Sequence, residues 1–470
     1  MKVLIIGGGA SGMMAALSAL ENPNNTVTLL ERQSRVGKKL LATGNGRCNL
    51  TNRNIRLSHY HGEQPEFARF ALESFYVGRT LAFFERLGLL TVTEDSGKVY
   101  PLSDQASSVL DVLRFALSAQ GANIVTSCDV IEVKHKARGY EALSATGETY
   151  FGDKLIIASG GAAGKKLGGS KSGYHLLEQL GHGTTALFPS LTQIKTDPAY
   201  VKALKGVRAD AHVQLRKDGE TLQDSFGEVQ FTDFGLSGPE AFTLSRAAAT
   251  GGEGQELALD FFREYGDSVL LDMLQEKREK LPELAAEDLF AGMLQSRLGR
   301  MIVKRAGLKY QTKLKELSDE QLLACVKTGK WFTLEVTGVM GFDSAQVTAG
   351  GARTREFDAR TLESTKNPGL FVCGEVLDVD GPCGGYNLQW AWSSGDVAGR
   401  SCAAQHCKTE KKCSYTIRAV RIRRKIIRSI FKEVSGKYVK TGRASDSTSR
   451  ISTRSYGTRG KESSPLKWNT

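Results

Sequence analysis

The sequence predicts an α/β fold that combines a parallel sheet with a separate, β-rich part of the chain. Residues 3–6, 155–158 and 370–373 are short, continuous apolar runs, as expected for parallel strands that are covered on both faces. Each run is followed closely by glycine, and the chain holds 51 glycines against 10 prolines without a collagen-like period. Glycine is therefore expected to serve tight turns and close backbone contacts at the ends of these strands.

Length and composition indicate a globular protein of two or three domains. With 470 residues the chain exceeds one ordinary core, and 40% hydrophobic against 24% charged residues exclude disorder for most of it. No apolar run reaches the roughly 20 residues of a membrane-spanning helix, so we expect a cytoplasmic protein without a membrane span. Eight scattered cysteines without a CxxC pair are typical of reduced thiols.

The net charge of +12 comes from the C-terminal tail alone. Residues 411–470 hold 17 Lys/Arg and 3 Asp/Glu, whereas the other 410 residues hold 46 and 48. The body is thus close to neutral, and nucleic-acid binding is predicted for no part except the tail. We expect residues 406–470 to be a basic, mostly disordered extension that a gene fusion or a change of reading frame has added and that has no selected role. The alternative is a basic amphipathic helix over residues 415–434 that binds RNA or a membrane surface.

The N-terminal apolar run leads directly into a Gly-x-Gly-x-x-Gly pattern, formed by Gly7, Gly9 and Gly12. Gly7 permits a tight turn, Gly9 lets a pyrophosphate approach the backbone, and Gly12 lets the following helix pack close to the strand. A second apolar strand then ends at Glu31, where a carboxylate can accept hydrogen bonds from an adenosine ribose. The combination predicts a dinucleotide-binding βαβ unit, but it does not choose between FAD and NAD.

A polar loop over residues 35–52 follows this unit, where an NAD-binding fold would normally continue into another helix and strand. Its Lys39 and Arg47 can meet phosphate charge, and its asparagines can form hydrogen bonds with a polar ring. The loop therefore favours a longer ligand that runs across it.

Three motifs together resemble the HI0933-like flavoproteins, bacterial FAD-binding oxidoreductases that include aminoacetone-oxidase-type and bile-acid-reductase-type members. The motifs are GKKLLATGNGRCNLTN at residues 37–52, FTDFGLSGP at 231–239, and GEVLDVDG with GGYNLQWA at 374–391. The likeness spans residues 1–405. It implies a Rossmann-like FAD-binding domain that is split in sequence around an inserted domain.

The implied boundaries place the two parts of the FAD-binding domain at residues 1–195 and 341–405. The insert takes residues 196–340, with a β-rich part at 196–264 and a helical part at 265–330. Alternation of apolar and polar residues predicts strands near 211–216, 228–234, 256–262 and 332–336, and helical periodicity predicts helices over 266–281, 285–305 and 318–328. Ser318 and Gln321 form a capping box at the start of the last helix. Such an insert would cover the flavin and shape a substrate pocket.

The resemblance also assigns roles to single residues. Glu375 and Asp378 would lie near the ribityl and phosphate end of FAD, Asn387 and Leu388 near its ring, and Val130 would offer its backbone to adenine. A helix that begins near Asn387 would direct N–H groups at the electron-rich ring. The complete set predicted to bind FAD is Gly7, Gly9, Ala10, Ser11, Gly12, Glu31, Arg32, Lys39, Gly44, Asn45, Gly46, Arg47, Asn49, Val130, Gly160, Gly374, Glu375, Asp378, Gly385, Asn387 and Leu388.

The expected activity is hydride transfer between FAD and a small organic substrate. NAD(P)H-dependent reduction of a conjugated enone, such as an oxo-bile-acid intermediate, is one form; oxidation of an amine of the aminoacetone type with oxygen is another. Only one complete dinucleotide motif is present, so NAD(P)H would bind transiently. A flavin-containing RNA-binding protein that uses the tail, and a flavin-binding scaffold without turnover, are alternatives of other classes.

No residue is assigned as the catalytic acid or base; Tyr386 is a candidate proton donor because it adjoins the flavin motif. Cys48 follows Arg47, but it lacks the partner that a disulfide reductase needs, and a packed thiol is favoured. A redox pair of Cys373 and Cys383 is a further alternative. The histidines of the His-x-His pattern at residues 59–61 have no third ligand nearby in the sequence, so no metal site is predicted.

Overall fold

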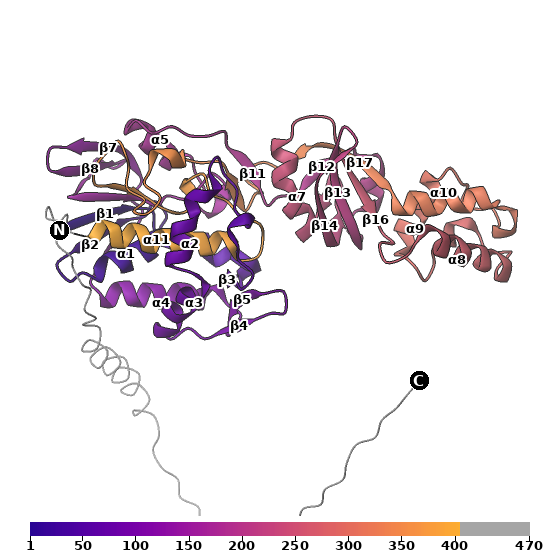
Figure 1. The fold of residues 1–470 in the computed structure, drawn as a ribbon, viewed down its shortest axis with the longest axis horizontal. Coiled ribbons are helices and arrows are strands. Elements are labelled where there is room, and N and C mark those ends of the chain that lie inside the picture. The colour runs from indigo at the N-terminus through magenta and orange to yellow at the C-terminus, as the bar shows by residue number, and fades with distance from the viewer. Residues whose placement is uncertain (405–470) are drawn as a thin grey trace, which may run out of the picture. The chain divides into compact units, whose positions relative to one another are not determined.

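A five-stranded parallel sheet forms the centre of one half of the protein in the computed structural model, which describes residues 1–404 (Figure 1). Its strand order, β19-β10-β1-β2-β6, brings together segments from both ends of the described chain. All neighbouring pairs are parallel, and the inner strands are buried, which accounts for their continuous apolar sequence. The strands are β1 (Lys2–Ile6), β2 (Thr26–Leu30), β6 (Asn123–Val125), β10 (Lys154–Ile157) and β19 (Leu370–Val372).

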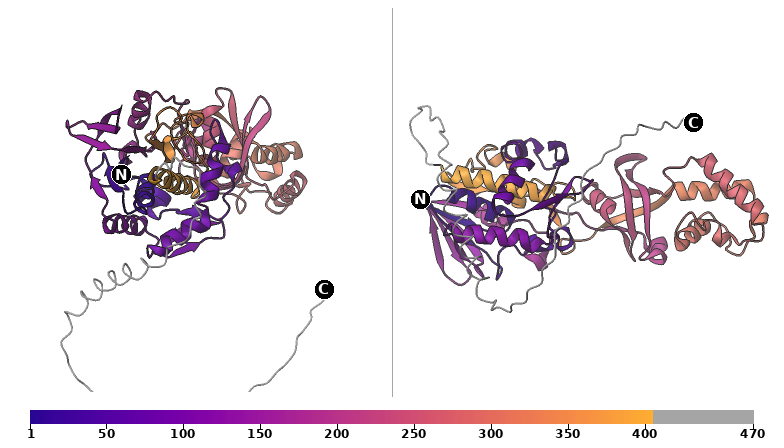
Figure 2. Two further views of the ribbon diagram at one scale, coloured as in Figure 1. Left: turned by 60° about the vertical axis from the view of Figure 1, so that its left-hand side comes forward. Right: turned by 90° about the horizontal axis from the view of Figure 1, so that it is seen from below.

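Two helices from opposite ends of the described chain, α1 (Ala10–Leu20) and α11 (Tyr386–Ala403), pack side by side (Figures 1 and 2). Their backbones approach closely because α11 presents glycines to α1. A Cβ atom at Gly395 would lie 2.5 Å from the Ser11 carbonyl oxygen, and one at Gly399 would lie 2.3 Å from the Ala15 carbonyl oxygen. Other helices of this half are α2 (Arg69–Ser74), α3 (Val77–Arg86), α4 (Ala106–Ala119) and α5 (Ser172–Gln179).

Three small antiparallel sheets accompany the parallel sheet. The first contains β7 (Val130–Lys136), β8 (Gly139–Ser144) and β9 (Thr149–Gly152), and the second contains β3 (Thr51–Asn52), β5 (Lys98–Pro101) and β4 (Thr91–Thr93). The third pairs β11 (Phe188–Ser190) with β18 (Val347–Ala349). This last pair holds together the two chain segments that lead into and out of the inserted part.

The inserted part begins with a closed barrel of six strands in the order β12-β15-β14-β13-β16-β17. Its longest strands alternate between more and less exposed residues, the pattern that predicted a strand over residues 211–216. The strands are β12 (Ile194–Thr196), β13 (Arg208–Lys217), β14 (Glu220–Phe231), β15 (Gly235–Ser237), β16 (Gln255–Asp260) and β17 (Phe332–Val339), and the helices α6 (Pro198–Val201) and α7 (Pro239–Thr250) belong to the same part.

A helical part lies between β16 and β17 along the chain and contains α8 (Asp267–Lys280), α9 (Ser296–Arg305) and α10 (Asp319–Lys330). The capping box before α10 is confirmed, since Ser318 Oγ accepts from Gln321 N at 3.3 Å and Gln321 Oε1 accepts from Ser318 N at 3.0 Å. The prediction of one helix over residues 285–305 is wrong. Gly292 has a left-handed φ of 83°, which interrupts the segment, and the α-helix begins only at Ser296.

Two separate hydrophobic cores correspond to these two regions. One combines residues 3–180 with residues 352–402, and the other takes its members from residues 194–336. The predicted α/β fold class, a parallel-sheet domain split around a β-rich and helical insert, is confirmed by this arrangement.

The predicted basic tail lies outside the described residues. Within residues 1–404, none of the helices combines the length and the apolar character that crossing a membrane requires.

The α1–α11 contact generates a stability prediction. Gly395→Ala places a methyl group 2.5 Å from the Ser11 carbonyl oxygen and 3.0 Å from Met14 Cβ, so the two helices must separate. We expect the free energy of unfolding to fall by about 2–3 kcal/mol in urea denaturation followed by circular dichroism. Ser401→Ala, near the end of the same helix, is the control and should change stability by less than about 0.5 kcal/mol. Equal stability of both variants would contradict the close-contact interpretation.

Candidate functional site

The first glycine turn is shaped by backbone contacts on one side and by open space on the other. A Cβ atom at Gly7, where φ is 110°, would lie 2.3 Å from the Ala158 carbonyl oxygen, and one at Gly12 would lie 1.9 Å from the Gly7 carbonyl oxygen. At Gly9, by contrast, an added Cβ would meet no described atom within 4 Å. Gly9 is the N-cap of α1 and provides no side-chain cap, so the first N–H groups of that helix remain available for an anion.

Glu31 stands at the end of β2 beside this turn. Its Oε2 accepts from Gly8 N at 2.7 Å and its Oε1 accepts from Gln33 N at 2.7 Å, which orients the carboxylate and leaves further lone pairs free. The Cys128 N–H donates to the Glu31 carbonyl at 2.9 Å, so the chain just before Val130 runs alongside. The structure thus brings Val130 to the same end of the sheet as Glu31.

The turn after β19 meets the first glycine turn directly. A Cβ atom at Gly374, where φ is 81°, would lie 2.3 Å from Ser11 Oγ. The next residue, Glu375, forms an ion pair with Lys39 Nζ at 2.7 Å and accepts from Thr348 N at 2.9 Å. Residues predicted from three separate motifs therefore lie together at the carboxyl end of the parallel strands.

The start of α11 contacts the polar loop of residues 35–52. A Cβ atom at Gly385, where φ is 99°, would lie 2.5 Å from the Thr51 carbonyl and 2.9 Å from Asn49 Oδ1. Asn49 Oδ1 is buried and has no hydrogen-bond partner in the described part of the chain. The α11 helix also begins without a side-chain cap. A buried free acceptor and a second uncapped helix start are features that a polar ring can satisfy.

Several predicted residues have protein partners instead of open space. Arg32 donates to the Gly168 carbonyl at 2.7 Å, while Arg47 pairs with Asp104 and Glu94 and lies 4.0 Å above the Tyr100 ring. The Asn387 amide bonds the loop that precedes α11, through Gly381 and Pro382.

Other predicted residues are placed by burial or by the turn they occupy. Asp378 is buried, which raises the pKa of its carboxyl group, and it accepts from Glu63 N at 2.9 Å. Gly44, Asn45 and Gly46 form an exposed left-handed turn, and an added Cβ at Gly160 would meet no described atom within 4 Å.

An ion pair between the two regions lies beside the start of α11 and was not predicted. Arg246 on α7 uses its Nε to donate to both carboxylate oxygens of Asp380, at 3.1 and 2.9 Å. The Asp380 side chain is 1% exposed, and burial raises its pKa to about 6 even though Arg246 favours the charged form. Asp380 occurs in a motif that the sequence singled out, but its partner lies 134 residues away, and no local pattern links the two.

The histidines of the pattern at residues 59–61 lie in the same cluster. His61 and Asp380 form a backbone bridge, with N–O distances of 2.8 and 3.1 Å. Burial, together with Arg246 and His59, lowers the pKa of His61 to about 4, so this imidazole is neutral at physiological pH. Across residues 1–404 no three potential ligands come together in a way that would hold a metal ion.

Tyr386, the first residue of α11, is held in place by neighbouring rings. The Tyr60 hydroxyl donates to the Tyr386 carbonyl at 3.0 Å, and the His59 ring meets the Tyr386 ring edge-on at 5.0 Å between centroids. Burial raises the pKa of the Tyr386 hydroxyl above its ordinary value of 10, so the group stays protonated at neutral pH.

Cys48 and Cys373 are both fully buried. Burial raises the pKa values of Cys48 and Cys373 to about 12, which keeps both thiols protonated and unreactive. The six cysteines of the described region are free, so Cys373 and Cys383 form no disulfide there. The packed-thiol interpretation of Cys48 agrees with its complete burial.

Comparison with known proteins identifies curated relatives along almost the full described length. A 3-dehydro-bile acid delta(4,6)-reductase from Clostridium scindens is 40% identical over 406 residues, which cover 86% of this chain and 99% of that protein. A ribosomal RNA dihydrouridine synthase from Escherichia coli is 30% identical over 394 residues, which cover 83% of this chain and 95% of that protein.

A solved structure, the 3-ketosteroid-delta4-(5alpha)-dehydrogenase from Rhodococcus jostii RHA1, is similar with a TM-score of 0.44 and 15% identity. The match covers 86% of this chain and 96% of that one. The sequence profile of the HI0933-like protein Rossmann domain matches residues 1–401. The family resemblance that the three motifs indicated is thereby confirmed: the chain belongs to the HI0933-like family and is an oxidoreductase.

Proposed function

We propose that this protein is an FAD-dependent reductase that saturates a carbon–carbon double bond conjugated with a carbonyl group. The substrate we propose is a small molecule of the bile-acid or steroid class, and NAD(P)H is the electron donor. The 40% identical relative is named for such a reaction. The name dihydrouridine synthase, carried by the 30% identical relative, also denotes reduction of a double bond next to a carbonyl. The two names share one chemical step, although their substrates differ.

FAD fits the residues that converge at the carboxyl end of the parallel strands. The open position at Gly9 and the uncapped start of α1 suit a pyrophosphate, and Glu31 suits a ribose. The unpartnered Asn49 Oδ1 and the uncapped start of α11 suit the polar edge of a flavin ring. When bound, FAD supplies hydride chemistry, which none of the protein side chains can provide.

The observation that carries the proposal is the Arg246–Asp380 pair beside the start of α11. Hydride addition to a conjugated enone leaves negative charge on the carbonyl oxygen and requires a proton at the α-carbon. Arg246 bonds Asp380 through Nε alone; its two terminal nitrogens make no hydrogen bond within residues 1–404, and its side chain is 26% exposed. In the proposed role, the Arg246 guanidinium stabilises the negative charge that develops on the substrate oxygen.

Tyr386 is the proposed proton donor because its hydroxyl retains its proton at neutral pH and because it is the first residue of α11. His61 is neutral and bonded to Asp380 through the backbone, so it has a positioning role in this proposal. The insert contributes Arg246 and the parallel-sheet region contributes Asp380 and Tyr386, which means that neither region forms the arrangement alone.

A second candidate is reduction of uridine in RNA, favoured by the 30% identity to a ribosomal RNA dihydrouridine synthase. The near-neutral charge of residues 1–410, which hold 46 basic and 48 acidic groups, argues against RNA contacts outside the basic tail. Amine oxidation remains an alternative from the family resemblance, and no contact described above favours it.

The decisive experiment is anaerobic reduction of the purified protein, monitored by the visible absorbance of the oxidised flavin. NADH and NADPH are tested separately as donors. The reduced protein is then mixed with a 3-oxo-Δ4,6 bile acid, a uridine-containing RNA, aminoacetone and oxygen. We expect NADH or NADPH to bleach the flavin and the bile acid to restore the colour fastest. A colourless protein that takes up no added FAD would contradict the proposal, and faster reoxidation by RNA would establish the second candidate.

Gly9→Ala separates cofactor binding from folding. Because an added Cβ meets no described atom and φ is −78°, the FAD-free protein should be as stable as the wild type, within about 0.5 kcal/mol. The same methyl group occupies the space proposed for the pyrophosphate, so FAD affinity should fall at least about tenfold, measured by fluorescence titration. Gly266→Ala is a matched control, because Gly266 is also a helix N-cap with an extended backbone and open space around it. Unchanged FAD affinity of Gly9→Ala would contradict the proposed position of the cofactor.

Asp380→Asn tests the proposed role of the Arg246–Asp380 ion pair through its pH dependence. The pKa of Asp380 is higher in the folded protein, at about 6, than in the unfolded chain, at about 3.9, so ionisation destabilises the fold. The Asp380 carboxyl group therefore contributes about 3 kcal/mol to the free energy of unfolding below about pH 4, and this contribution is lost as the pH rises through 6.

We therefore expect Asp380→Asn to be more stable than the wild type at pH 7.5, and the two denaturation midpoints to converge toward pH 4. At pH 7.5 the variant should lose at least about tenfold in kcat/KM, because Arg246 loses its anionic partner. The exposed Asp95→Asn serves as the control. A variant that is destabilised equally at both pH values would show that the carboxylate has a purely structural role.

A further inference from the structure

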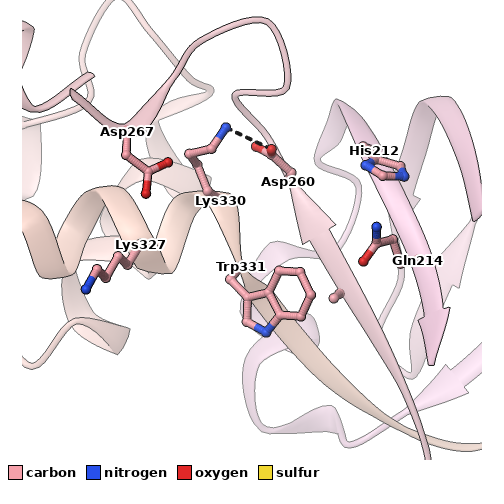
Figure 3. Close-up of a pocket in the computed structure, with 8 residues that line it drawn as sticks. His212, Gln214, Asp260, Asp267, Lys327, Lys330 and Trp331 are labelled. Atoms are coloured by element: carbon pink, nitrogen blue, oxygen red, sulfur yellow. Dashed lines mark hydrogen bonds and ion pairs between the residues drawn. The ribbon is translucent and has the colours of Figure 1, made fainter. Parts of the chain in front are cut away.

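A cavity of about 510 Å³ lies on the outside of the barrel, next to the helical part of the insert (Figure 3). It contains none of the residues predicted to bind FAD, and its wall comes from β13, β16, α8, α10 and the residue after α10. Its size is in the range of pockets that bind small molecules. The lining residues are His212, Gln214, Ala258, Asp260, Asp267, Lys327, Lys330 and Trp331.

The floor of the cavity follows from the strand register. Gln214 on β13 pairs with Ala258 on β16, and Ala258 pairs in turn with Thr333 on β17. Ala258 has the smallest side chain in this row and is buried, so the surface of the sheet is recessed between its neighbours. Figure 3 shows the Gln214 amide and the Trp331 ring directed into the same space.

The Gln214 amide has no hydrogen-bond partner within residues 1–404, and its Oε1 atom is buried. If the amide oxygen and nitrogen were exchanged, an N–H group without a partner would lie at the same place. A hydrogen-bond partner is therefore missing whichever of the two atoms is the oxygen. A buried polar group of this kind normally has a partner. The cavity beside it provides the space for one.

Trp331 presents a large aromatic surface to solvent, since its side chain is 46% exposed. The guanidinium carbon of Arg216 lies 4.6 Å from the ring centroid and covers one face. The pair leaves the other face of a fixed indole ring for a planar ligand.

Three of the titratable residues of the cavity, Asp260, Lys330 and His212, already have partners. Lys330 bonds Asp260 at 2.9 Å and also the carbonyls of Phe262 and Tyr265, and His212 bonds Asp224 and stacks on Phe226. Asp267 and Lys327 are of opposite charge, and within residues 1–404 neither side chain forms an ion pair or a hydrogen bond. The neutral recognition groups of the cavity are one amide and one aromatic face.

We propose that this cavity binds a planar aromatic ring with a lactam edge, that is, an N–H group next to a carbonyl. The ring would stack on Trp331, its N–H would donate to Gln214 Oε1, and its carbonyl would accept from Gln214 Nε2. This two-bond match is specific to adjacent donor and acceptor groups. The site is separate from the proposed catalytic arrangement, and the inference does not depend on the proposed reaction.

Binding is tested with lumazine, a fluorescent bicyclic lactam, titrated into the full-length protein after saturation with FAD. We expect saturable binding at one site with quenching of the probe. 3-Methyllumazine, which lacks the N–H donor, should bind at least about tenfold more weakly. Gln214→Leu and Trp331→Ala should each weaken lumazine binding at least about tenfold. The control is Gln120→Leu, which changes an exposed glutamine in the parallel-sheet region and should leave lumazine binding unchanged.

The melting temperature of Gln214→Leu distinguishes a binding role from a structural one. An amide without a protein partner contributes nothing to folding, so this variant should melt at the wild-type temperature or above it while it loses the probe. The inference is overturned if lumazine does not bind saturably, if both lactams bind equally, or if Gln214→Leu retains binding. A melting temperature several degrees lower would show that the amide has a structural partner.

Discussion

The backbone contact between α1 and α11 is the constraint on which the rest of the structure depends. Gly395 and Gly399 allow α11 to approach the carbonyl oxygens of Ser11 and Ala15, and no larger residue would permit that distance. This contact brings the turn after β19 against the first glycine turn, and it fixes the start of α11 beside the loop that contains Asn49. A helix from the far end of the described chain thus lies against the first glycine turn, where the cofactor is proposed to bind.

The contact between the two regions adds a different kind of constraint. Asp380 is almost completely buried, which raises the pKa of its carboxyl group to about 6 even though it faces the positively charged Arg246 of the insert. A neutral residue of similar size would avoid the desolvation of a charge. A buried carboxylate that lowers stability is more often found where chemistry requires it than where packing alone does. This reasoning is why the proposed function gives Arg246 and Asp380 a role beside the start of α11.

Local patterns were sufficient for a large part of the fold. The strand, glycine turn and helix around Gly7, Gly9 and Gly12 follow from residues that are neighbours in sequence, and so does the capping box of Ser318. The helix predicted over residues 285–305 failed because helical periodicity does not register a left-handed glycine such as Gly292. The Arg246–Asp380 pair was missed for a related reason: it joins positions that only the folded insert brings together.

The sequence by itself determined the fold class, the family and the identity of the glycine turns, because each depends on short-range spacing or on motifs that survive as continuous strings. Tertiary structure alone decided which side chains remain available. Arg47, a predicted phosphate contact, is paired with carboxylates, whereas Asn49 is left with a free buried oxygen. Hydrogen bonds between distant segments depend on three-dimensional proximity and on desolvation, and neither quantity is encoded in the order of neighbouring residues.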